Sequence, residues 1–247
     1  MIGILYFSST GNSLQIAKAV QAQFGGKILY IPNYSGNGSE FERIFLVSPI
    51  YSFGVPTPVF NLLPKLSTTP QIIAILNYGG MVGGADALLY KYAKQYKLNL
   101  ASIYTLKMPE NYTLTFTVPK FYLTSVLKSS YKRINEVIDK IKNNQFSLPH
   151  SKKTKEQTYL KNKGNWHIIG QRFKSSPACI KCQKCVKLCP VGNISFKDGQ
   201  IVFGDKCIAC LGCYHRCPQK AIKYLNKNKK FRYINPNINE SDIGKDF

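Results

Sequence analysis

Hydrophobic and polar positions in the first 145 residues form short apolar runs separated by longer stretches with amphipathic periodicity. The apolar runs predict five buried strands, at Ile2–Phe7, Lys27–Ile31, Arg43–Ser48, Gln71–Asn77 and Ala101–Lys107. The periodic stretches predict helices at Ser13–Phe24, Thr57–Leu66, Ala85–Tyr96 and Leu123–Asn143. Because strands and helices alternate, we expect an α/β domain with a doubly wound five-stranded parallel sheet, whose ligands bind at the carboxyl ends of the strands.

The pattern changes beyond this domain, which we expect to span residues 1–145. Residues 146–176 are polar, rich in lysine and weakly periodic, and they predict a basic linker. Its apolar patch of Trp166, Ile168, Ile169 and Phe173 is expected to dock a second module, at 177–225, onto the first. Residues 226–247 form a polar tail that we expect to be loosely held.

The second module contains an internal repeat. The segment CIKCQKCVKLCP at 179–190 recurs as CIACLGCYHRCP at 207–218, so that every cysteine is displaced by 28 residues. This repeat indicates two copies of one half-module related by a pseudo-twofold axis. His215 lies inside the second copy, and we expect it at the surface without a ligand role.

All eight cysteines of the chain lie in this repeat. Zinc is one alternative, although zinc sites usually combine C-x-x-C pairs that are separated by a long gap. Three cysteines at C-x-x-C-x-x-C spacing, followed by a fourth and a proline, instead form the bacterial ferredoxin run, in which the fourth cysteine ligates the other cluster. The run predicts two [4Fe–4S] clusters with crossed ligand sets, one of Cys179, Cys182, Cys185 and Cys217 and one of Cys207, Cys210, Cys213 and Cys189.

Residues 177–225 thus resemble the two-cluster bacterial-type ferredoxins, whose small domains have an α+β fold. The sequence departs from the commonest form at Gln183 and Leu211, where a glycine often follows the second cysteine. Three lysines, at positions 181, 184 and 187, accompany the first motif. They either offset the negative charge of the cluster or form a solvated basic face.

A polar loop follows the first predicted strand. Ser8, Ser9, Thr10, Gly11, Asn12 and Ser13 stand in a row before the first helix. Free amide donors and the helix dipole make such a turn an anion site. The lysine of a Walker motif and the three glycines of a Rossmann fingerprint are absent. A simple cap at the start of the helix remains the alternative.

This loop matches T/S-x-T-G-N-T/S, the phosphate loop of flavodoxins, so the N-terminal domain resembles that family. The resemblance assigns the six residues to the phosphate of FMN and implies two ring-contacting loops at later strand ends. In SPIYSFGVPTP at 48–58 the candidates are Pro49, Tyr51, Phe53 and Gly54, and in LNYGGMVGGA at 76–85 they are Asn77, Tyr78, Gly79 and Gly80. Asn111 in MPENYT either reaches the flavin or caps a turn.

The charge of the chain narrows the choice of partners. Its 247 residues carry a formal net charge of +22, and the basic surplus is spread along the whole chain. Because lysine greatly outnumbers arginine, an acidic protein partner or an anionic membrane surface is favoured over nucleic acid. The two ring loops contain no Asp or Glu, which predicts a less negative flavin potential than in acidic flavodoxins.

The whole chain resembles fusions of a flavodoxin-like domain with a two-cluster ferredoxin. The first predicted strand follows Met1 directly and no run approaches ~18 apolar residues, so we expect a cytoplasmic protein without a signal peptide or membrane span. Electron transfer between the clusters and FMN, linked to a one-electron protein carrier or a reductase, is the leading prediction. The alternatives are a flavin-dependent reductase of a quinone or another small acceptor, and a regulatory module with structural metal. No separate catalytic residues are predicted.

Overall fold

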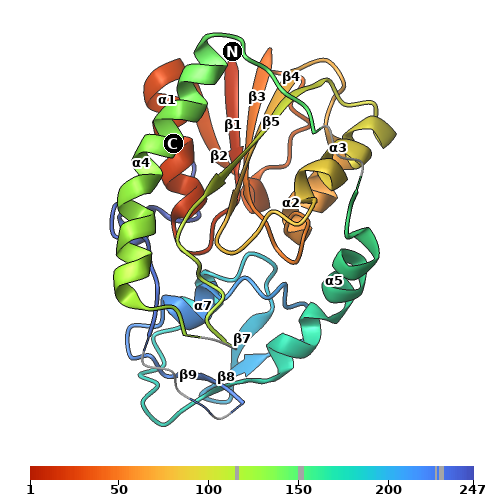
Figure 1. Cartoon of the computed structure of the whole chain (residues 1–247). Helices are drawn as coiled ribbons and strands as arrows, with labels where there is room; N and C mark the ends of the chain where they lie inside the picture. The colour runs from red at the N-terminus through yellow and green to blue at the C-terminus, as the bar shows by residue number, and fades with distance from the viewer. Residues whose placement is uncertain (115–116, 150–152, 226, 228–230) are drawn as a thin grey trace.

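The fold has an α/β domain and a smaller cysteine-containing domain below it, as Figure 1 shows. A computed structural model describes residues 1–114, 117–149, 153–225, 227 and 231–247. Residues 150–152 of the expected linker and residues 226 and 228–230 of the expected tail lie outside this description. Among the described residues, no helix is long and apolar enough to cross a membrane.

The central sheet confirms the predicted class. Five parallel strands lie in the order β2-β1-β3-β4-β5, which is the flavodoxin-like doubly wound order. They are β1 (Ile2–Tyr6), β2 (Lys27–Tyr30), β3 (Arg43–Pro49), β4 (Gln71–Tyr78) and β5 (Leu100–Lys107). The chain direction across the sheet reverses between β1 and β3, so the loops that leave these strands diverge and create a crevice at their carboxyl ends.

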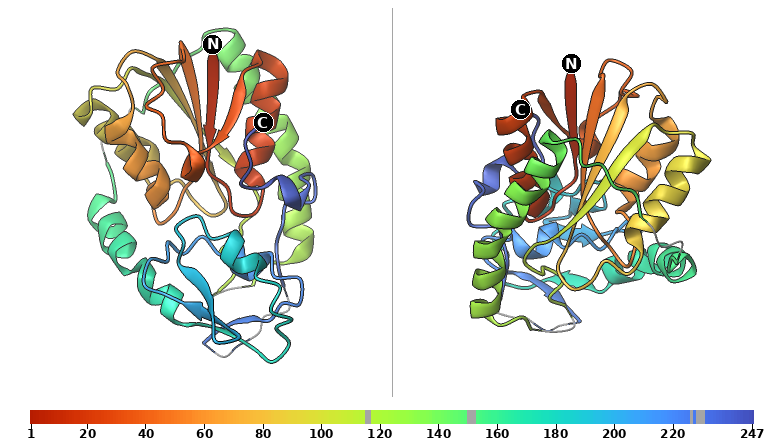
Figure 2. Two further views of the ribbon diagram at one scale, coloured as in Figure 1. Left: turned by 180° about the vertical axis from the view of Figure 1, so that it is seen from behind. Right: turned by 45° about the horizontal axis from the view of Figure 1, so that its top comes forward.

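Helices cover both faces of the sheet. α1 (Asn12–Phe24) and α4 (Lys120–Lys142) lie on one face, and α2 (Thr57–Leu62) and α3 (Ala85–Gln95) lie on the other (Figures 1 and 2). The central strands are almost continuously apolar because both of their sides are buried. Short 3-10 turns, η1 (Ile31–Asn33) and η2 (Leu63–Lys65), follow β2 and α2.

The C-terminal domain is built from short elements around the cysteines. It contains two small antiparallel pairs, β6 (Phe173–Ser175) with β9 (Ile222–Tyr224), and β7 (Ile194–Lys197) with β8 (Gln200–Phe203). One short helix lies in each cysteine motif, α6 (Lys184–Lys187) in the first and α7 (Gly212–His215) in the second. The expected small α+β domain is therefore present.

The basic linker expected at residues 146–176 is helical over much of its length. Residues Glu156–Gln171 form a regular helix, α5, which runs from the sheet domain down to the cysteine domain (Figure 1). The hydrophobic periodicity is weak because α5 packs only at separate points along its length. Tyr159 is completely buried and Trp166 is 4% exposed, whereas Lys161 is exposed and Lys163 is half-buried.

The expectation of a loosely held tail at residues 226–247 is wrong for the part that the structure describes. Residues 231–247 run back along the sheet domain beside α1 (Figure 2), and they include the short turn η3 (Glu240–Asp242). Phe247 exchanges two backbone hydrogen bonds with Ile28 of β2, at 2.7 and 2.8 Å, and so pairs with the edge of the sheet. Asn235 is completely buried, and its N–H donates to the carbonyl of Thr10 at 2.8 Å.

We predict that the tail contributes substantially to stability through Asn235. Its Nδ2 atom donates to Asn12 Oδ1 at 3.2 Å and to Gln15 Oε1 at 2.7 Å. Asn235→Ala therefore leaves the buried Gln15 Oε1 without a donor, whereas Asn12 Oδ1 keeps the bond from the Tyr233 hydroxyl. The free energy of unfolding is expected to fall by about 3 kcal/mol, measured by urea denaturation. Asn237→Ala, at an exposed position two residues away, is the matched control. Equal stability of the two variants would show that the tail is not anchored here.

Candidate flavin and cluster sites

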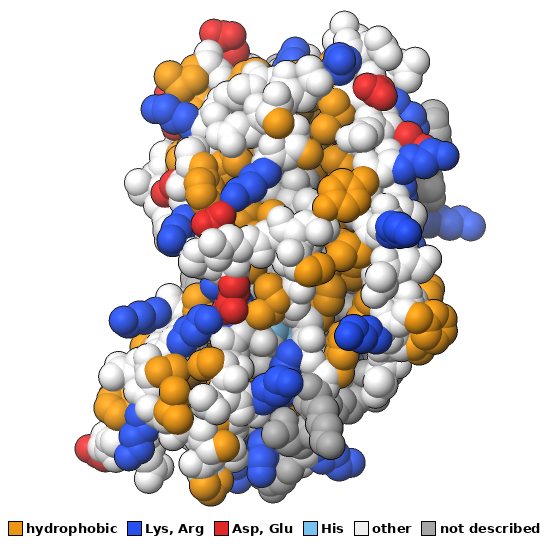
Figure 3. Space-filling view, turned by 90° about the vertical axis from the view of Figure 1, so that its left-hand side faces the viewer, with side chains coloured by type: hydrophobic (Ala, Val, Ile, Leu, Met, Phe, Trp, Pro, Cys, Tyr) orange, Lys and Arg blue, Asp and Glu red, His pale blue; other side chains and the backbone are white. Residues whose placement is uncertain are grey.

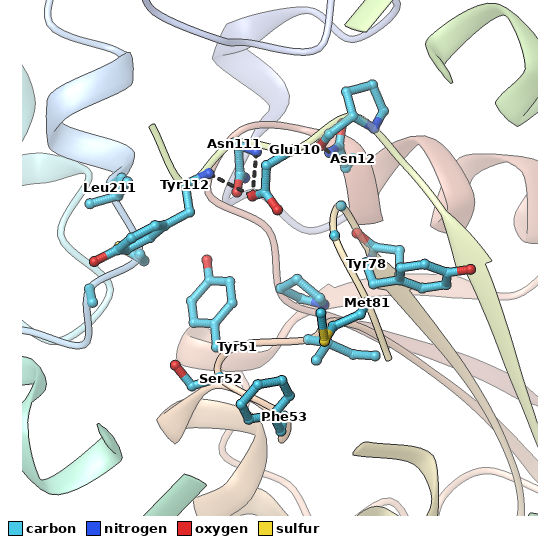
Figure 4. A pocket seen from close by; sticks show the side chains of 18 of the residues that line it. Asn12, Tyr51, Ser52, Phe53, Tyr78, Met81, Glu110, Asn111, Tyr112 and Leu211 are labelled. Carbon is cyan, nitrogen blue, oxygen red and sulfur yellow. Dashed lines mark hydrogen bonds between the residues drawn. The ribbon is translucent and has the colours of Figure 1, made fainter. Parts of the chain in front are cut away.

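A cavity of about 290 Å³ opens at the carboxyl ends of β3, β4 and β5, where the topology predicts a ligand site. Its lining includes most of the predicted ring-contact residues and one residue of the phosphate loop: Pro49, Tyr51, Phe53, Asn77, Tyr78, Gly79, Gly80, Asn111 and Asn12. Tyr51, Phe53 and Met81 face the hollow in Figure 4, whereas the Tyr78 ring points away from the other aromatic rings. The cavity is mainly apolar with convergent amide groups, as cofactor sites usually are.

The loop from Ser8 to Ser13 joins β1 to α1 and is buried. Gly11 precedes the helix with a φ of 98°, which glycine adopts without steric cost, and no side chain caps the helix. The first bond of the helix runs from the N–H of Gln15 to the carbonyl of Gly11. Among the described residues, the N–H groups of residues 12–14 therefore have no acceptor, although these residues are buried. Such a set of amides fits a phosphate group.

Side chains of the phosphate loop are held in place by amide donors. Asn111 Nδ2 donates to Thr10 Oγ1 at 2.7 Å, and Asn77 Nδ2 donates to Ser13 Oγ at 2.8 Å. Each hydroxyl accepts one bond and keeps its own proton for a further acceptor such as a phosphate oxygen. Asn111 therefore does more than cap a turn: it lines the cavity and also positions the loop. The simple helix-cap alternative is disfavoured because no side chain caps α1.

His215 is buried, which contradicts the expected surface position; it is only 2% exposed. Its Nδ1 accepts the N–H of Tyr233 at 3.1 Å, so the proton lies on Nε2, which donates to the carbonyl of Asn111 at 2.7 Å. Burial lowers the pKa of His215 to about 4, which keeps the ring neutral. The Tyr233 hydroxyl in turn donates to Asn12 Oδ1 at 2.7 Å. This network joins the cysteine domain, the tail and the phosphate loop.

Aromatic side chains from two parts of the chain form one wall of the cavity. Tyr51 is edge-on to Trp166, with ring centroids 6.1 Å apart, and its hydroxyl lies 3.3 Å from Ser9 Oγ. Burial raises the pKa of Tyr51, so its hydroxyl stays protonated. Gly54, a predicted ring-contact residue, does not line the cavity. A Cβ there would lie 2.5 Å from the ring of Tyr159, so the absence of a side chain at Gly54 allows α5 to pack closely and does not make room for a flavin. The sequence indicates only a docking role for Trp166, because nothing near it in the chain points to a cavity.

Glu110 is a cavity residue that the sequence pattern does not reveal. Its Oε1 accepts the N–H groups of Asn111 and Tyr112, at 2.9 and 2.7 Å, and its other oxygen points into the hollow (Figure 4). The sequence predicts a less negative flavin potential because two loops contain no Asp or Glu. The loop after β5 adds the carboxylate of Glu110 to the cavity, so the cavity as a whole does contain an acidic side chain.

The cysteines surround two further small cavities. Cys179, Cys182, Cys185 and Cys217 line one, and Cys189, Cys207, Cys210 and Cys213 line the other. This is the grouping that the crossed ligand sets require. A single zinc ion would need its sulfurs about 2.3 Å from one point. Among the described residues, no three Cys, His, Asp or Glu side chains are arranged to hold one ion, whereas sulfurs spread around a hollow suit a cluster.

The two cysteine motifs repeat in backbone conformation as well as in sequence. Lys181 and Gln183 have φ values of 57°, and their counterparts Ala209 and Leu211 have 56° and 59°. Gln183 and Leu211 thus occupy the left-handed conformation in which ferredoxins often place glycine, at a cost of roughly 1–2 kcal/mol each. Backbone N–H groups also donate to sulfur in both halves, from Asn193 to Cys189 Sγ at 3.1 Å and from Ala221 to Cys217 Sγ at 3.3 Å.

The second cysteine motif touches the first cavity directly. Ala209, Cys210 and Leu211 line it opposite the loops of the sheet domain. Burial raises the pKa of Cys210 to about 12, so metal binding there must displace a proton. α5 closes the same junction, because Gly170 packs on Cys207 with no room for a side chain between them. Cys182, the counterpart of Cys210, is exposed.

Comparison with known proteins agrees with this geometry. The family model of the 4Fe–4S dicluster domain matches residues 178–222. Pyruvate synthase subunit PorD of Methanothermobacter marburgensis is 41% identical over 64 residues, which are 26% of this chain and 75% of that protein. The C-terminal region belongs to the 4Fe–4S dicluster ferredoxins. With the 2-1-3-4-5 parallel sheet before it, the chain joins an α/β domain of flavodoxin-like fold to this ferredoxin region.

Other relatives share only parts of this fusion. A component of the ion-translocating oxidoreductase complex of Methanosarcina acetivorans is 46% identical over 46 residues, so the match spans only 18% of this chain and 17% of that protein. The flavodoxin of Fusobacterium nucleatum bound to flavin mononucleotide is 20% identical with a TM-score of 0.41, covering 59% of this chain and 98% of that one. The two-electron reduced flavodoxin of Megasphaera elsdenii is 19% identical with a TM-score of 0.37, covering 42% and 87%.

The crossed grouping of cysteines predicts which substitutions act on the same cluster. Cys189→Ser, although it lies in the first motif, is expected to remove the same cluster as Cys213→Ser, while Cys217→Ser removes the other. Each variant should keep about half of the iron, because one four-iron cluster remains. Iron analysis and electron paramagnetic resonance of the reduced variants measure this. Identical spectra for Cys189→Ser and Cys185→Ser would contradict the crossing.

Proposed function

We propose that the chain transfers electrons between its two [4Fe–4S] clusters and an FMN held in the cavity above β3, β4 and β5. The contact of Cys210 with that cavity carries this proposal, because a cluster ligand and the proposed flavin residues line one hollow. Because the second cluster site and the proposed flavin site adjoin, no separate electron carrier is needed between them. The lining of this cavity is mainly apolar, and the buried Trp166 forms part of it.

The residues of the two domains have distinct roles in this proposal. Amides at the start of α1 and the hydroxyls of Thr10 and Ser13 would hold the phosphate, and Tyr51 and Phe53 would contact the ring system. FMN, when bound, supplies chemistry that exchanges one or two electrons, so it connects one-electron clusters to two-electron reactions. The polar network through His215 keeps the cysteine domain seated over the flavin loops.

We also propose an acidic one-electron carrier, of the ferredoxin or flavodoxin type, as the partner. Electrons would pass between this carrier and the first cluster, whose ligand Cys182 is exposed, and then by way of the second cluster to the flavin. The net charge of +22 supports an acidic partner. Figure 3 shows Lys and Arg side chains spread over the whole of one face, where they outnumber the Asp and Glu side chains.

The decisive experiment combines cofactor analysis with electron transfer. Anaerobically reconstituted protein should bind about one FMN and about eight irons per chain, as one flavin and two four-iron clusters require. Mixing with an acidic two-cluster ferredoxin, previously reduced by dithionite, should bleach the flavin absorbance. Cys213→Ser should still bind FMN but should be reduced far more slowly. Failure to bind FMN, or equal rates for the two proteins, would refute the proposal.

Glu110 is expected to make the bound flavin harder to reduce. Its carboxylate lines the cavity, so Glu110→Gln removes one negative charge beside the ring while the amide oxygen still accepts both backbone N–H bonds. The flavin midpoint potential should rise by on the order of 50 mV, the effect of one unit charge at moderate dielectric screening. Spectroscopic redox titration of the holoprotein measures this. Glu136→Gln on the exposed side of α4 is the control, and an equal shift there would exclude a local effect.

A further inference from the structure

A second cavity, of about 420 Å³, also borders the loop from Ser8 to Ser13. It is enclosed by Ser8 and Ser9 of that loop, by the segment around α6 and by residues 241–245 of the tail. Cys210 is the only described residue that this cavity shares with the proposed flavin cavity. The two hollows are therefore separate sites.

Four cationic side chains line this second cavity: Lys184, Lys187, Arg216 and Lys245. No Asp or Glu is among its described lining residues. Glu240, just outside, pairs with both Lys184 and Arg216, the latter at 3.3 Å. Within the described part of the chain, Lys187 and Lys245 have no acidic partner. The lining thus includes two exposed lysines, Lys187 and Lys245, whose positive charge no described acidic side chain offsets.

Arg216 makes this wall rigid. Its side chain is only 5% exposed, and Nη2 donates to the carbonyl of Glu240 at 2.7 Å. Nη1 donates to the carbonyl of Ile243 at 3.4 Å. These bonds fix the tail against α7, so the cavity exists before any ligand arrives. Preorganised positive groups in a concave, partly desolvated site attract anions more strongly than the same charges spread over a flat surface.

The remaining polar groups of the lining suit an oxyanion. Ser8 and Ser9 contribute hydroxyls, which can donate to oxygen, and the lysines supply compact point charges that commonly bind phosphate. We propose that this cavity binds a small oxyanion with two or more negative charges, carried by phosphate or carboxylate groups. The inference does not depend on FMN, because its four cationic residues, unlike Ser8 and Ser9, belong to no part of the proposed flavin site.

The simpler explanation is that the lysines only offset the negative charge of the second cluster, whose ligands Cys189 and Cys210 lie on the same wall. That explanation predicts no saturable anion binding. It also predicts that replacing a lysine alters the cluster without altering an affinity. A binding measurement separates the two explanations.

Isothermal titration calorimetry tests the proposal on anaerobic holoprotein that carries both clusters and saturating FMN. Pyrophosphate and citrate are the two probes, and they distinguish a phosphate-bearing ligand from a carboxylate-bearing one. We expect one saturable site for at least one probe. Lys187→Gln and Lys245→Gln should each weaken its affinity about tenfold, the usual size of a lost charge-assisted bond. Lys197→Gln, an exposed lysine on β7, should leave it unchanged.

Three outcomes would overturn this inference. Neither probe binds, or Lys197→Gln weakens binding as much as the cavity variants do, which would indicate unspecific attraction to a basic protein. Alternatively, binding appears only in FMN-free protein and is abolished by FMN, which would place the anion on the flavin phosphate loop. Because FMN binding is measured separately, failure of the flavin proposal leaves this test intact: the variants then report on the FMN-free protein with both clusters.

Discussion

The relative position of the two domains depends on a buried hydrogen-bond network at their junction. His215 from the second cysteine motif bonds to the loop after β5, and Tyr233 from the tail bonds to Asn12 of the phosphate loop. Water is excluded from this junction, so each polar group must find its partner inside the protein or lose the full value of its hydration. Such a network allows one arrangement of the domains. The cluster motif is therefore held against the proposed flavin cavity rather than tethered at a variable distance.

Apolar packing adds to this polar constraint from the opposite side. α5 places Tyr159 and Trp166 against the loop after β3, where Tyr159 OH donates to the carbonyl of Val55 at 2.7 Å. Large aromatic side chains bury much surface for little loss of conformational freedom, so these two anchor an otherwise mainly polar helix. The same helix brings Gly170 onto Cys207. One segment thus closes the cavity, covers a cluster site and connects the domains.

The tail completes the arrangement from the α1 side. It pairs with the edge of β2, covers the phosphate loop with Asn235 and contributes Lys245 to the basic cavity. An exposed parallel sheet edge is prone to unwanted pairing, and a C-terminal segment that covers it removes that hazard. Residues from both ends of the chain therefore meet around the loop from Ser8 to Ser13. That loop contributes Asn12 to a mainly apolar cavity, and Ser8 and Ser9 to a basic one.

The sequence by itself determined the class of each domain and the ligand chemistry of the cysteines. These predictions rest on local patterns, which can be read directly from the sequence. The patterns are the strand periodicity, the loop from Ser8 to Ser13 and the 28-residue cysteine repeat. Only the tertiary structure decided the roles of Trp166, Glu110, His215 and Asn235. Most of these act through a partner far away in the chain: Trp166 on Tyr51, His215 on Asn111 and Asn235 on Asn12. The weak periodicity of α5 predicted only a linker, and the polar composition of the tail predicted a loosely held segment. Both are held by a few long-range contacts and not by a continuous apolar face, so neither contact pattern can be read from the local sequence.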